Sequence, residues 1–407
     1  MAEHIFDILT ERGFVEQTTD AEQLRRTLDT PTTVYVGFDP TADSLHVGHM
    51  LPIMGLAHLQ RAGHRPIALV GGGTALIGDP SGKTELRRML TREDIDANAV
   101  GMREQLGRFL DFEKGALLLN NADWLAPLNY IEFLRDVGIH FSVNRMIAAE
   151  SYRQRLETGL NFIEFNYMLL QAYDYLVLNQ RYDCVVQMGG NDQWGNILAG
   201  VDLIRRVEGA TAHACTFPLV TTSSGAKMGK TAAGAVWLDA ERTSPYEFYQ
   251  YWINTEDPDV ARFLGLFTFL PTDEVLRLSR LQGAELRTAK ETLAFEVTRL
   301  VHGAAAAEGA RDASLALFSG AGDLDTAPTF EIPLQRLEDG VEAFVLFHEA
   351  GLAKSRGEAR RLIQQGGAYV NGETVAAIDR TVNSADLEDG AVLLRAGKKK
   401  YCAVRPI

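Results

Sequence analysis

The chain has 407 residues, 46% of them hydrophobic and 23% charged, which is typical of a folded globular protein with two or three domains. No apolar run approaches the roughly 20 residues that a membrane-spanning helix needs, and the acidic, amphipathic N-terminus is unlike a signal peptide. The three cysteines are far apart and fit neither a disulfide framework nor a metal site. We therefore expect a cytoplasmic protein with no protein-bound metal and no membrane contact.

The net charge of −14 argues against a protein that binds nucleic acid over most of its surface, but the charge is distributed unevenly along the chain. Residues 341–407 hold 10 Lys+Arg against 8 Asp+Glu, whereas the remainder holds 30 against 46. A slightly basic end on an acidic body can contact RNA locally, but the charge alone does not decide this.

The first half of the chain alternates strands and helices. Residues 4–29 predict one or two helices, and the apolar segment 33–38 predicts a buried strand. A helix at 46–62 and a second strand at 66–70 follow directly. This order is a βαβ unit, so the sequence predicts an α/β fold with a parallel sheet. Such sheets bind ligands at the carboxyl ends of their strands.

Two histidines stand at the start of the helix that follows the first strand. His46 and His49 are three residues apart, so they lie on nearly the same helical face. The free backbone N–H groups and the dipole of a helix start favour anions. The segment therefore predicts a polyphosphate site.

A glycine-rich segment, GGGTALIGDPSGKTELRR at 71–88, follows the second strand. Its spacing fits neither the P-loop nor the dinucleotide fingerprint. The glycines still allow a ligand to approach the backbone closely, and the segment also carries the charged residues Asp79, Lys83 and Arg87. Asp79 could serve as a turn residue before a proline or bind an ammonium group, and the segment leaves both interpretations open.

A helix, a short strand and a mostly helical segment are predicted next, at 92–112, 117–119 and 127–180. Within the last of these, Tyr167, Gln171 and Asp174 share one otherwise apolar face. Buried polar groups need partners, so this face predicts either an internal hydrogen-bond network or a bound ligand.

A strand is predicted at 184–188, and the segment GGNDQWGN follows it. Asp192 in this segment follows a strand at the start of a helix, a position from which acidic residues often bind ribose hydroxyls. A further strand is predicted at 216–220. The loop TTSSGAKMGKT at 221–231 then carries Lys227 and Lys230. It could be a solvated turn or a mobile loop that closes on a phosphate chain.

The C-terminal third is predicted to be helical from 245 to 320 and then to continue through an irregular linker at 321–335. In the last unit, Ser355 and Glu358 form a capping pattern, and Asn371–Gly372 signals a hairpin. A basic edge is formed by Lys354, Arg356, Arg360 and Arg361.

Taken together, these segments resemble the bacterial-type tyrosyl-tRNA synthetases, a class I aminoacyl-tRNA synthetase family, over essentially the whole chain. The sequence HVGH at 46–49 resembles the class I HIGH motif, and KMGKT at 227–231 resembles the KMSKS motif. Residues 341–407 resemble an S4 RNA-binding domain. The resemblance implies an α/β fold: a Rossmann-like parallel-sheet catalytic domain, an α-helical domain and a small α+β S4-like domain.

The implied domains are a catalytic domain, a signature loop with its connector, a helical domain, a linker and an S4-like domain, at 1–220, 221–247, 248–320, 321–335 and 336–407. The catalytic domain is expected to contain a helical insertion at about 120–185. Where family members often have Cys, this chain has Val36, which cannot hydrogen-bond a ribose hydroxyl.

The resemblance also implies roles for individual residues. The tyrosine pocket would consist of Tyr35, Asp79, Asn121, Tyr167, Gln171, Asp174, Gln187 and Gln193. The ATP contacts would be Gly37, Asp39, Gly48, His49, Asp192, Lys83, Arg87 and Lys230. The groups acting on the reacting phosphates would be Thr41, His46, His49, Lys227, Lys230 and Thr231. The RNA contacts would include the basic edge of the S4-like unit.

The implied reaction is the ATP-dependent ligation of L-tyrosine to tRNA(Tyr) through tyrosyl-adenylate, with Mg²⁺ arriving on ATP and with a homodimer as the assembly. Two alternatives remain beside it. A catalytically inactive RNA-binding paralogue is disfavoured because the signature histidines and lysines are all present. A tryptophan-specific synthetase is disfavoured by Tyr35, Asp174 and the S4-like tail.

Overall fold

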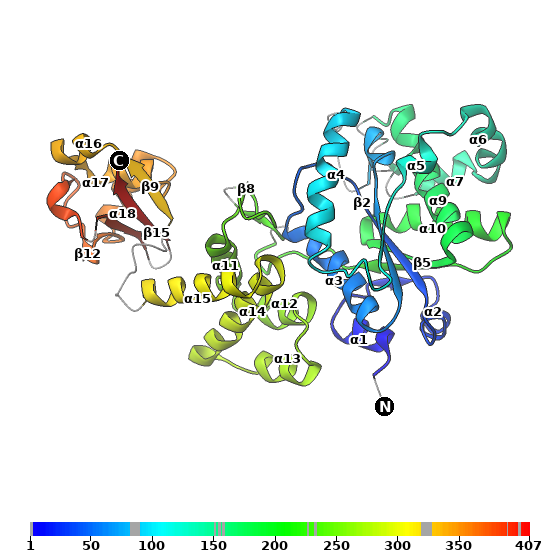
Figure 1. The fold of residues 1–407 in the computed structure, drawn as a ribbon, viewed down its shortest axis with the longest axis horizontal. Helices are drawn as coiled ribbons and strands as arrows, with labels where there is room; N and C mark the ends of the chain where they lie inside the picture. The colour runs from blue at the N-terminus through cyan, green and yellow to red at the C-terminus, as the bar shows by residue number, and fades with distance from the viewer. Residues whose placement is uncertain are drawn as a thin grey trace. The chain divides into compact units, whose positions relative to one another are not determined.

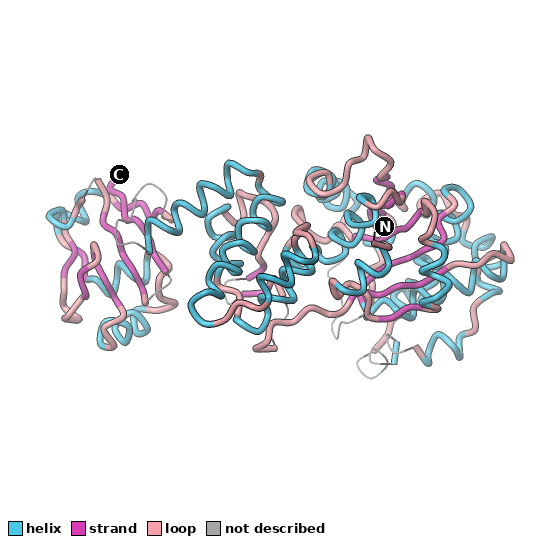
Figure 2. Tube along the Cα trace, turned by 90° about the horizontal axis from the view of Figure 1, so that it is seen from below, coloured by secondary structure: helices cyan, strands magenta, loops and turns pink. Residues whose placement is uncertain are grey.

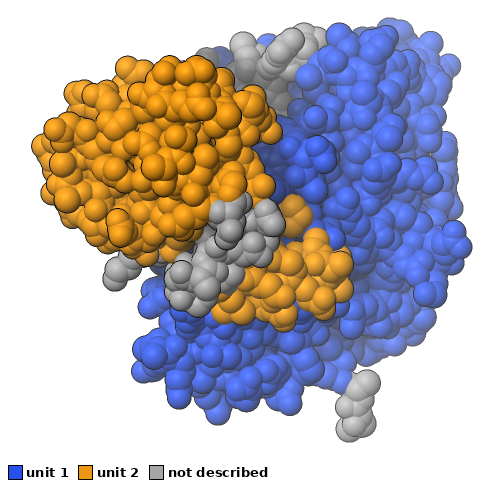
Figure 3. All heavy atoms as spheres, turned by 60° about the vertical axis from the view of Figure 1, so that its left-hand side comes forward, with its two compact units in different colours: residues 1–244, 251–302 blue, residues 245–250, 303–407 orange. Residues whose placement is uncertain are grey.

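The computed structural model describes residues 3–81, 90–149, 152–153, 156, 159–225, 228–231, 234–318, 328–388, 390–397 and 400–407. They form two compact units, residues 1–244 with 251–302 and residues 245–250 with 303–407 (Figure 3). The fivefold division into domains expected from the sequence stays a prediction.

The first unit is built on a six-stranded sheet with the order β1-β6-β5-β2-β3-β4 (Figures 1 and 2). Its strands are β1 Gln17–Thr18, β2 Thr33–Phe38, β3 Arg65–Val70, β4 Leu117–Asn120, β5 Cys184–Gly190 and β6 His213–Phe217. All neighbouring pairs are parallel except β1 with β6. The predicted α/β class and parallel sheet are therefore confirmed. The strand order reverses between β5 and β2, which is where doubly wound folds bind ligands.

The helices of the first unit are α1 Ile5–Glu11, α2 Ala21–Thr27, α3 Val47–Arg61, α4 Arg92–Leu106, α5 Ala122–Leu125, α6 Tyr130–Asp136, α7 Val143–Ala148, α9 Phe162–Tyr182, α10 Trp194–Val207, α12 Val260–Phe267, α13 Thr272–Ser279 and α14 Leu286–His302. They pack either on this sheet, as α3, α9 and α10 do, or on one another, as α12, α13 and α14 do (Figure 1). Helix α11 spans Pro245–Ile253. Tyr35 and Leu69 point into the core that the sheet shares with α9. Alternation along β2 therefore sends Tyr35 toward α9.

Helix α9 carries the polar face predicted from the sequence, and residues at both ends fix where this helix starts and stops. Asn161 caps the start of the helix, because its side chain accepts the Glu164 N–H at 2.9 Å. The Glu164 side chain in turn accepts the Asn161 N–H, which completes a capping box. The helix ends at Asp183, whose φ of 53° is left-handed. Between these ends, Tyr167 and Asp174 are buried.

Two predicted elements have different ends in the structure. The strand expected at 216–220 is instead β6, ending at Phe217, because Pro218 has no N–H for a ladder bond. The helix expected at 92–112 ends at Leu106, where Gly107 follows.

The second unit contains a five-stranded sheet with the order β12-β11-β14-β15-β9. Its strands are β9 Thr329–Ile332, β11 Ala368–Val370, β12 Glu373–Thr374, β14 Val392–Ala396 and β15 Lys400–Pro406; β10 Val341–Glu342 and β13 Thr381–Val382 pair separately. Its helices are α15 Ala304–Phe318, α16 Leu334–Asp339, α17 Ala343–Glu349 and α18 Arg356–Gln364. Of the linker predicted at 321–335, residues 321–327 lie outside the described residues, and residues 329–332 form β9, which pairs in parallel with β15.

Local signals in the second unit behave as predicted. Asn371 and Gly372 have φ of 46° and 81°, the left-handed pair of a tight hairpin turn between β11 and β12. The Ser355 side chain accepts the Glu358 N–H at 3.2 Å and so caps α18. Among the described residues of both units, no helix is long and apolar enough to cross a lipid bilayer.

Candidate active site

A cavity of about 370 Å³ lies at the carboxyl ends of β2 and β5, at the reversal of strand order. Predicted site residues from separate parts of the chain line it: Tyr35, Gly37, Asp39, Thr41, His46, His49, Asp79, Asn121, Tyr167, Gln171, Asp174, Gln187, Asp192 and Gln193. The parallel strands bring these residues together because their carboxyl ends meet at one edge.

The deep end of the cavity holds a buried carboxylate with two donors. Trp124 Nε1 donates to Asp174 Oδ1 at 2.7 Å, and Asn121 Nδ2 donates to Oδ2 at 2.9 Å. Burial raises the pKa of Asp174 to about 7, against the opposing effect of these two hydrogen bonds. The carboxylate keeps acceptor capacity for one more donor.

Two other buried atoms at this end have no hydrogen-bond partner within the described part of the chain. They are the Tyr35 hydroxyl and Gln187 Oε1. Both residues are at most 2% exposed. Burial, followed by the charge of Asp174, raises the pKa of Tyr35 well above its usual value. A buried polar group without a partner costs about 1–3 kcal/mol, so these atoms indicate a polar ligand group between them and Asp174.

Asp79 is a second buried carboxylate that lines the cavity. Asp79 accepts the Ser81 N–H at 2.9 Å and Gln193 Nε2 at 2.6 Å. Burial raises the pKa of Asp79 to about 6. Of the two interpretations left open by the sequence, the carboxyl group does serve the turn at Ser81, and its cavity position also suits an ammonium group.

The remaining residues of the α9 face are tied to this region. Gln171 Oε1 accepts Asn196 Nδ2 at 3.1 Å, and the Tyr167 hydroxyl donates to Asp39 Oδ2 at 3.4 Å. The α9 face is therefore both an internal network and a cavity wall.

The ammonium role that the resemblance to tyrosyl-tRNA synthetases implies for Asp79 gives a testable prediction. Below pH 6, the affinity for tyrosine should fall about tenfold per pH unit more steeply than the affinity for a tyrosine analogue without the amino group. Asp79 must be ionised to pair with the ammonium group, and its pKa in the free protein is about 6. Calorimetric titration between pH 5 and 8 measures this. A tyrosine analogue without the amino group is the control, since it senses Asp174 but not Asp79. Parallel pH profiles for both ligands would contradict the assignment.

The histidines at the start of α3 form a defined pair. His46 is the N-cap: its Nδ1 accepts the Gly48 N–H at 3.0 Å, while His49 Nδ1 accepts the His46 N–H at 3.1 Å. A neutral ring that accepts at Nδ1 carries its proton on Nε2. Burial, then the neighbouring His46, lowers the pKa of His49 to about 3. His49 is therefore neutral, and in both rings the proton lies on Nε2, beside the helix N-terminus.

Gly48 is not part of the cavity wall, but its lack of a side chain makes the pair possible. A Cβ there would lie 2.7 Å from His46 Cε1. The second signature approaches at the same point, because a Cβ on Gly229 would lie 3.0 Å from the Gly48 nitrogen. The backbones of two motifs about 180 residues apart thus meet at the start of α3.

Five other predicted site residues are either outside the described residues or described by their backbone alone. Lys83, Arg87 and Lys227 lie outside the described residues. Lys230 and Thr231 are described only as the backbone of strand β7, which pairs with β8 Gly234–Ala235.

Three residues of the site were not found from the sequence. Trp124 orients Asp174, and Thr74 accepts Asn121 Nδ2 at 3.0 Å while donating to Asp39 Oδ1 at 3.1 Å. Asn196 links Gln171 with Gln193. Its position three residues after Gln193 at a helix start could have suggested it. No sequence signal marks Trp124 or Thr74.

The basic edge of the second unit is on its surface. Lys354, Arg356, Arg360 and Arg361 are all exposed, at or within α18. Arg360 also stacks on the Phe344 ring, with its guanidinium carbon 4.0 Å from the ring centroid.

Comparison with known proteins agrees with this site. The family model "tRNA synthetases class I (W and Y)" matches residues 27–319, and "Tyrosine--tRNA ligase SYY-like C-terminal domain" matches residues 324–404. A Rossmann-like sheet with histidines at the first helix start and a lysine loop against it is the arrangement of a class I aminoacyl-tRNA synthetase. The chain belongs to the tryptophan and tyrosine group of that class.

Individual relatives show which family within this group the chain belongs to. It is 59% identical to the tyrosine–tRNA ligase of Desulfosudis oleivorans over 98% of both chains, and 57% identical to that of Syntrophus aciditrophicus over 99% of both. A truncated mitochondrial tyrosyl-tRNA synthetase from Aspergillus nidulans matches with a TM-score of 0.71 and 32% identity, covering 78% of this chain and 94% of that one. Within the group, the chain falls in the tyrosine–tRNA ligase family, which confirms the resemblance found in the sequence.

Proposed function

We propose that the protein attaches L-tyrosine to tRNA(Tyr) in two steps. ATP and tyrosine form tyrosyl-adenylate and pyrophosphate, and the tyrosyl group then passes to the 3′-terminal ribose of the tRNA. One observation carries the proposal. A single cavity is lined by Asp174, by Tyr35 and Gln187, whose buried oxygens have no partner among the described residues, and by paired histidines at a helix start. The names of the relatives support the same activity.

In the first step, a carboxylate oxygen of tyrosine attacks the α-phosphorus of ATP and pyrophosphate leaves, so no protein nucleophile is required. Asp174 accepts the phenol proton in a hydrogen bond, and Asp79 pairs with the ammonium group. The Nε2–H donors of His46 and His49 act on the phosphates, where charge builds in the transition state. Thr41 and the signature residues Lys227, Lys230 and Thr231 complete this group in our proposal.

The ribose and adenine of ATP are assigned to the rim near Gly37, Asp39 and Asp192, and Lys83 and Arg87 to the phosphates. Within the described residues, no group of three or more His, Cys, Asp or Glu side chains is arranged to hold a metal ion. Mg²⁺ would arrive with ATP and supply charge neutralisation there. We propose the cytoplasm as the compartment, where tRNA and ATP are available.

The decisive experiment is ATP–pyrophosphate exchange measured separately with each of the 20 amino acids. Exchange with tyrosine alone is the expected result. Exchange with tryptophan alone would identify the tryptophan-specific alternative, and no exchange with any amino acid would identify an inactive paralogue. Either of these outcomes overturns the proposal.

We propose that the basic edge of the second unit binds tRNA phosphates. Replacing Lys354, Arg356 and Arg361 with Gln is expected to raise the KM for tRNA about tenfold and to weaken its salt dependence, since fewer phosphate contacts release fewer counterions. Arg360 is left intact because it packs on Phe344. Aminoacylation at several salt concentrations measures the effect.

The matched control for this test is Arg380→Gln in the same unit, because Arg380 is paired with Asp386. Adenylate formation should be unchanged in both variants. An unchanged KM for tRNA in the triple variant would remove these residues from the RNA contact.

We also propose a homodimer formed through the helical segment between β4 and β5. It exposes large apolar side chains: Tyr130, Ile131, Leu134, Ile139, Val143, Ile147, Phe162 and Ile163. An apolar surface of this density is typical of an obligate interface between copies. Ile139, 75% exposed, and Phe162, 68% exposed, are the most accessible aliphatic and aromatic members.

The double variant I139D/F162D is expected to be monomeric, because dimerisation would bury two carboxylates in an apolar interface. Light scattering coupled to size-exclusion chromatography measures the mass. Leu276→Asp, at a 53% exposed leucine on α13, is the control and should leave the mass unchanged. A monomeric wild type, or a dimeric double variant, would refute the interface.

A further inference from the structure

The segment downstream of the second signature is joined directly to the first signature. Val47 N–H donates to the Val236 carbonyl at 2.9 Å, and Leu238 N–H donates to the Leu45 carbonyl at 2.9 Å. His46 and Trp237 therefore face each other across a short antiparallel bridge. The same segment holds the second signature, because Val236 N–H donates to the Gly229 carbonyl at 2.9 Å.

Arg242, Trp237 and His46 form a stack of side chains that ends at His46. The Trp237 ring meets the His46 ring edge-on, with centroids 6.0 Å apart and planes at 71°. The Arg242 guanidinium covers the Trp237 ring, with its central carbon 3.4 Å from the ring centroid. Arg242 also pairs with Asp43, three residues before His46. The backbone N–H of Trp237 donates to the Thr243 hydroxyl at 3.0 Å, which closes the turn that carries Arg242.

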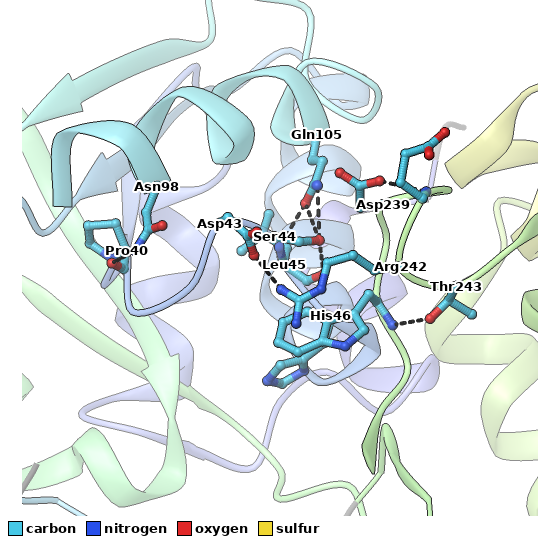
Figure 4. Close-up of polar contacts among 12 residues, drawn as sticks. Pro40, Asp43, Ser44, Leu45, His46, Asn98, Gln105, Asp239, Arg242 and Thr243 are labelled. Carbon is cyan, nitrogen blue, oxygen red and sulfur yellow. Dashed lines mark hydrogen bonds and ion pairs between the residues drawn. The ribbon is translucent and has the colours of Figure 1, made fainter. Parts of the chain in front are cut away.

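Helix α4 fixes the segment that leads to His46 from the other side (Figure 4). The Leu45 N–H donates to buried Gln105 Oε1 at 2.8 Å, and Asn98 Nδ2 donates to the Pro40 carbonyl at 3.0 Å. A Cβ on Gly101 would lie 2.3 Å from the Asp43 carbonyl oxygen, so α4 touches this segment closely. The backbone of His46 is thus fixed, whereas its ring is held by the N-cap bond, by the His49 ring with its centroid 4.0 Å away, and by the Trp237 contact.

We propose that Arg242 is a positioning residue for adenylate formation. It does not line the cavity. It holds the Trp237 ring against His46 and ties the downstream anchor of the second signature to Asp43. The stack thereby fixes the direction in which His46 presents its Nε2–H donor. The proposal rests on the proposed function, because His46 is taken to act on the phosphates of ATP.

The geometry favours positioning over a role in holding the fold. Asp43 is 70% exposed and Arg242 35% exposed, and ion pairs of this kind contribute little to folding. A small misdirection of a group that acts on the transition state costs far more in rate than in stability. Only a planar guanidinium can both stack on Trp237 and pair with Asp43, so lysine is a poor substitute.

The test is the rate constant of tyrosyl-adenylate formation, measured by single-turnover kinetics with tyrosine and ATP. Arg242→Ala is expected to slow this step about tenfold, with tyrosine affinity and thermal midpoint nearly unchanged. Arg242→Lys should recover only part of the rate. Arg277→Ala is the matched control, because Arg277 pairs with Glu274 on exposed α13 and should leave the rate unchanged.

A double-mutant cycle with His46 separates positioning from a general structural role. In a His46→Ala background, Arg242→Ala should have almost no further effect, because the ring it orients is gone. A wild-type rate in Arg242→Ala, or a tenfold loss that persists in the His46→Ala background, would overturn the proposal. Failure of the wild type to form tyrosyl-adenylate would instead refute the proposed function.

Discussion

His46→Ala is expected to slow tyrosyl-adenylate formation about 10²–10³-fold while leaving tyrosine affinity nearly unchanged. This is the usual loss when one preorganised donor to a developing charge is removed. His46 lines the cavity, we propose that it faces the phosphates of ATP, and its Nδ1 already accepts the Gly48 N–H. Its contribution therefore comes from Nε2–H, in the transition state rather than in tyrosine binding.

His4→Ala is a closely matched control for this variant. His4 is the N-cap of α1, and its Nδ1 accepts the Phe6 N–H at 3.1 Å, as His46 accepts that of Gly48. Loss of either cap should cost about 1 kcal/mol of stability. Only the His46 variant should lose rate, as measured by single-turnover kinetics at saturating ATP. Equal rates in the two variants would show that His46 serves as a cap alone.

The catalytic core could be predicted from sequence because its signals are local. Strand β2 has the predicted bounds, Thr33–Phe38, since a run of buried β-branched and aromatic residues between turn residues is specific. The helix start at His46 was likewise marked by adjacent residues. Parallel pairing then brings the ends of β2 and β5 together without any further assumption.

Other features depend on distant contacts and could not be predicted. The two residues of β1 are a strand only because they pair with β6, and β9 is one because it pairs with β15. Trp124 became a site residue through a hydrogen bond to Asp174, 50 positions away. The contact of Trp237 with His46 is of the same kind. Such partners follow from the packed chain, and single-sequence patterns do not specify them.

Asp174→Ala is expected to lower kcat/KM for tyrosine about 10²-fold with little effect on phenylalanine, and so to remove much of the discrimination between them. In our proposal the Asp174 carboxylate is the charged acceptor for the phenol O–H, and hydrogen bonds to charged acceptors are stronger than those between neutral groups. Tyrosyl-tRNA synthetases are themselves the known example of roughly 10⁵-fold rejection of phenylalanine, so that figure is a property of the class rather than a result of this structure.

Tyr35→Phe tests the same contact without disturbing the core. Asp174→Ala also leaves the Trp124 and Asn121 donors unpaired, so it can lose stability as well as affinity. The Tyr35 hydroxyl, by contrast, is buried and lacks a partner within the described residues. Its removal should weaken tyrosine activation about tenfold and raise the free energy of unfolding by about 1 kcal/mol.

These opposite signs make the pair of measurements specific. Pyrophosphate exchange with tyrosine and with phenylalanine gives the discrimination, and denaturant unfolding without ligand gives the stability. An ordinary core tyrosine would lose stability on truncation and leave the discrimination unchanged. A variant that is more stable and less selective can be explained only if the substrate phenol is the hydrogen-bond partner of the Tyr35 hydroxyl. In the free protein this buried hydroxyl then lowers the stability of the fold, and in the complex it recognises tyrosine.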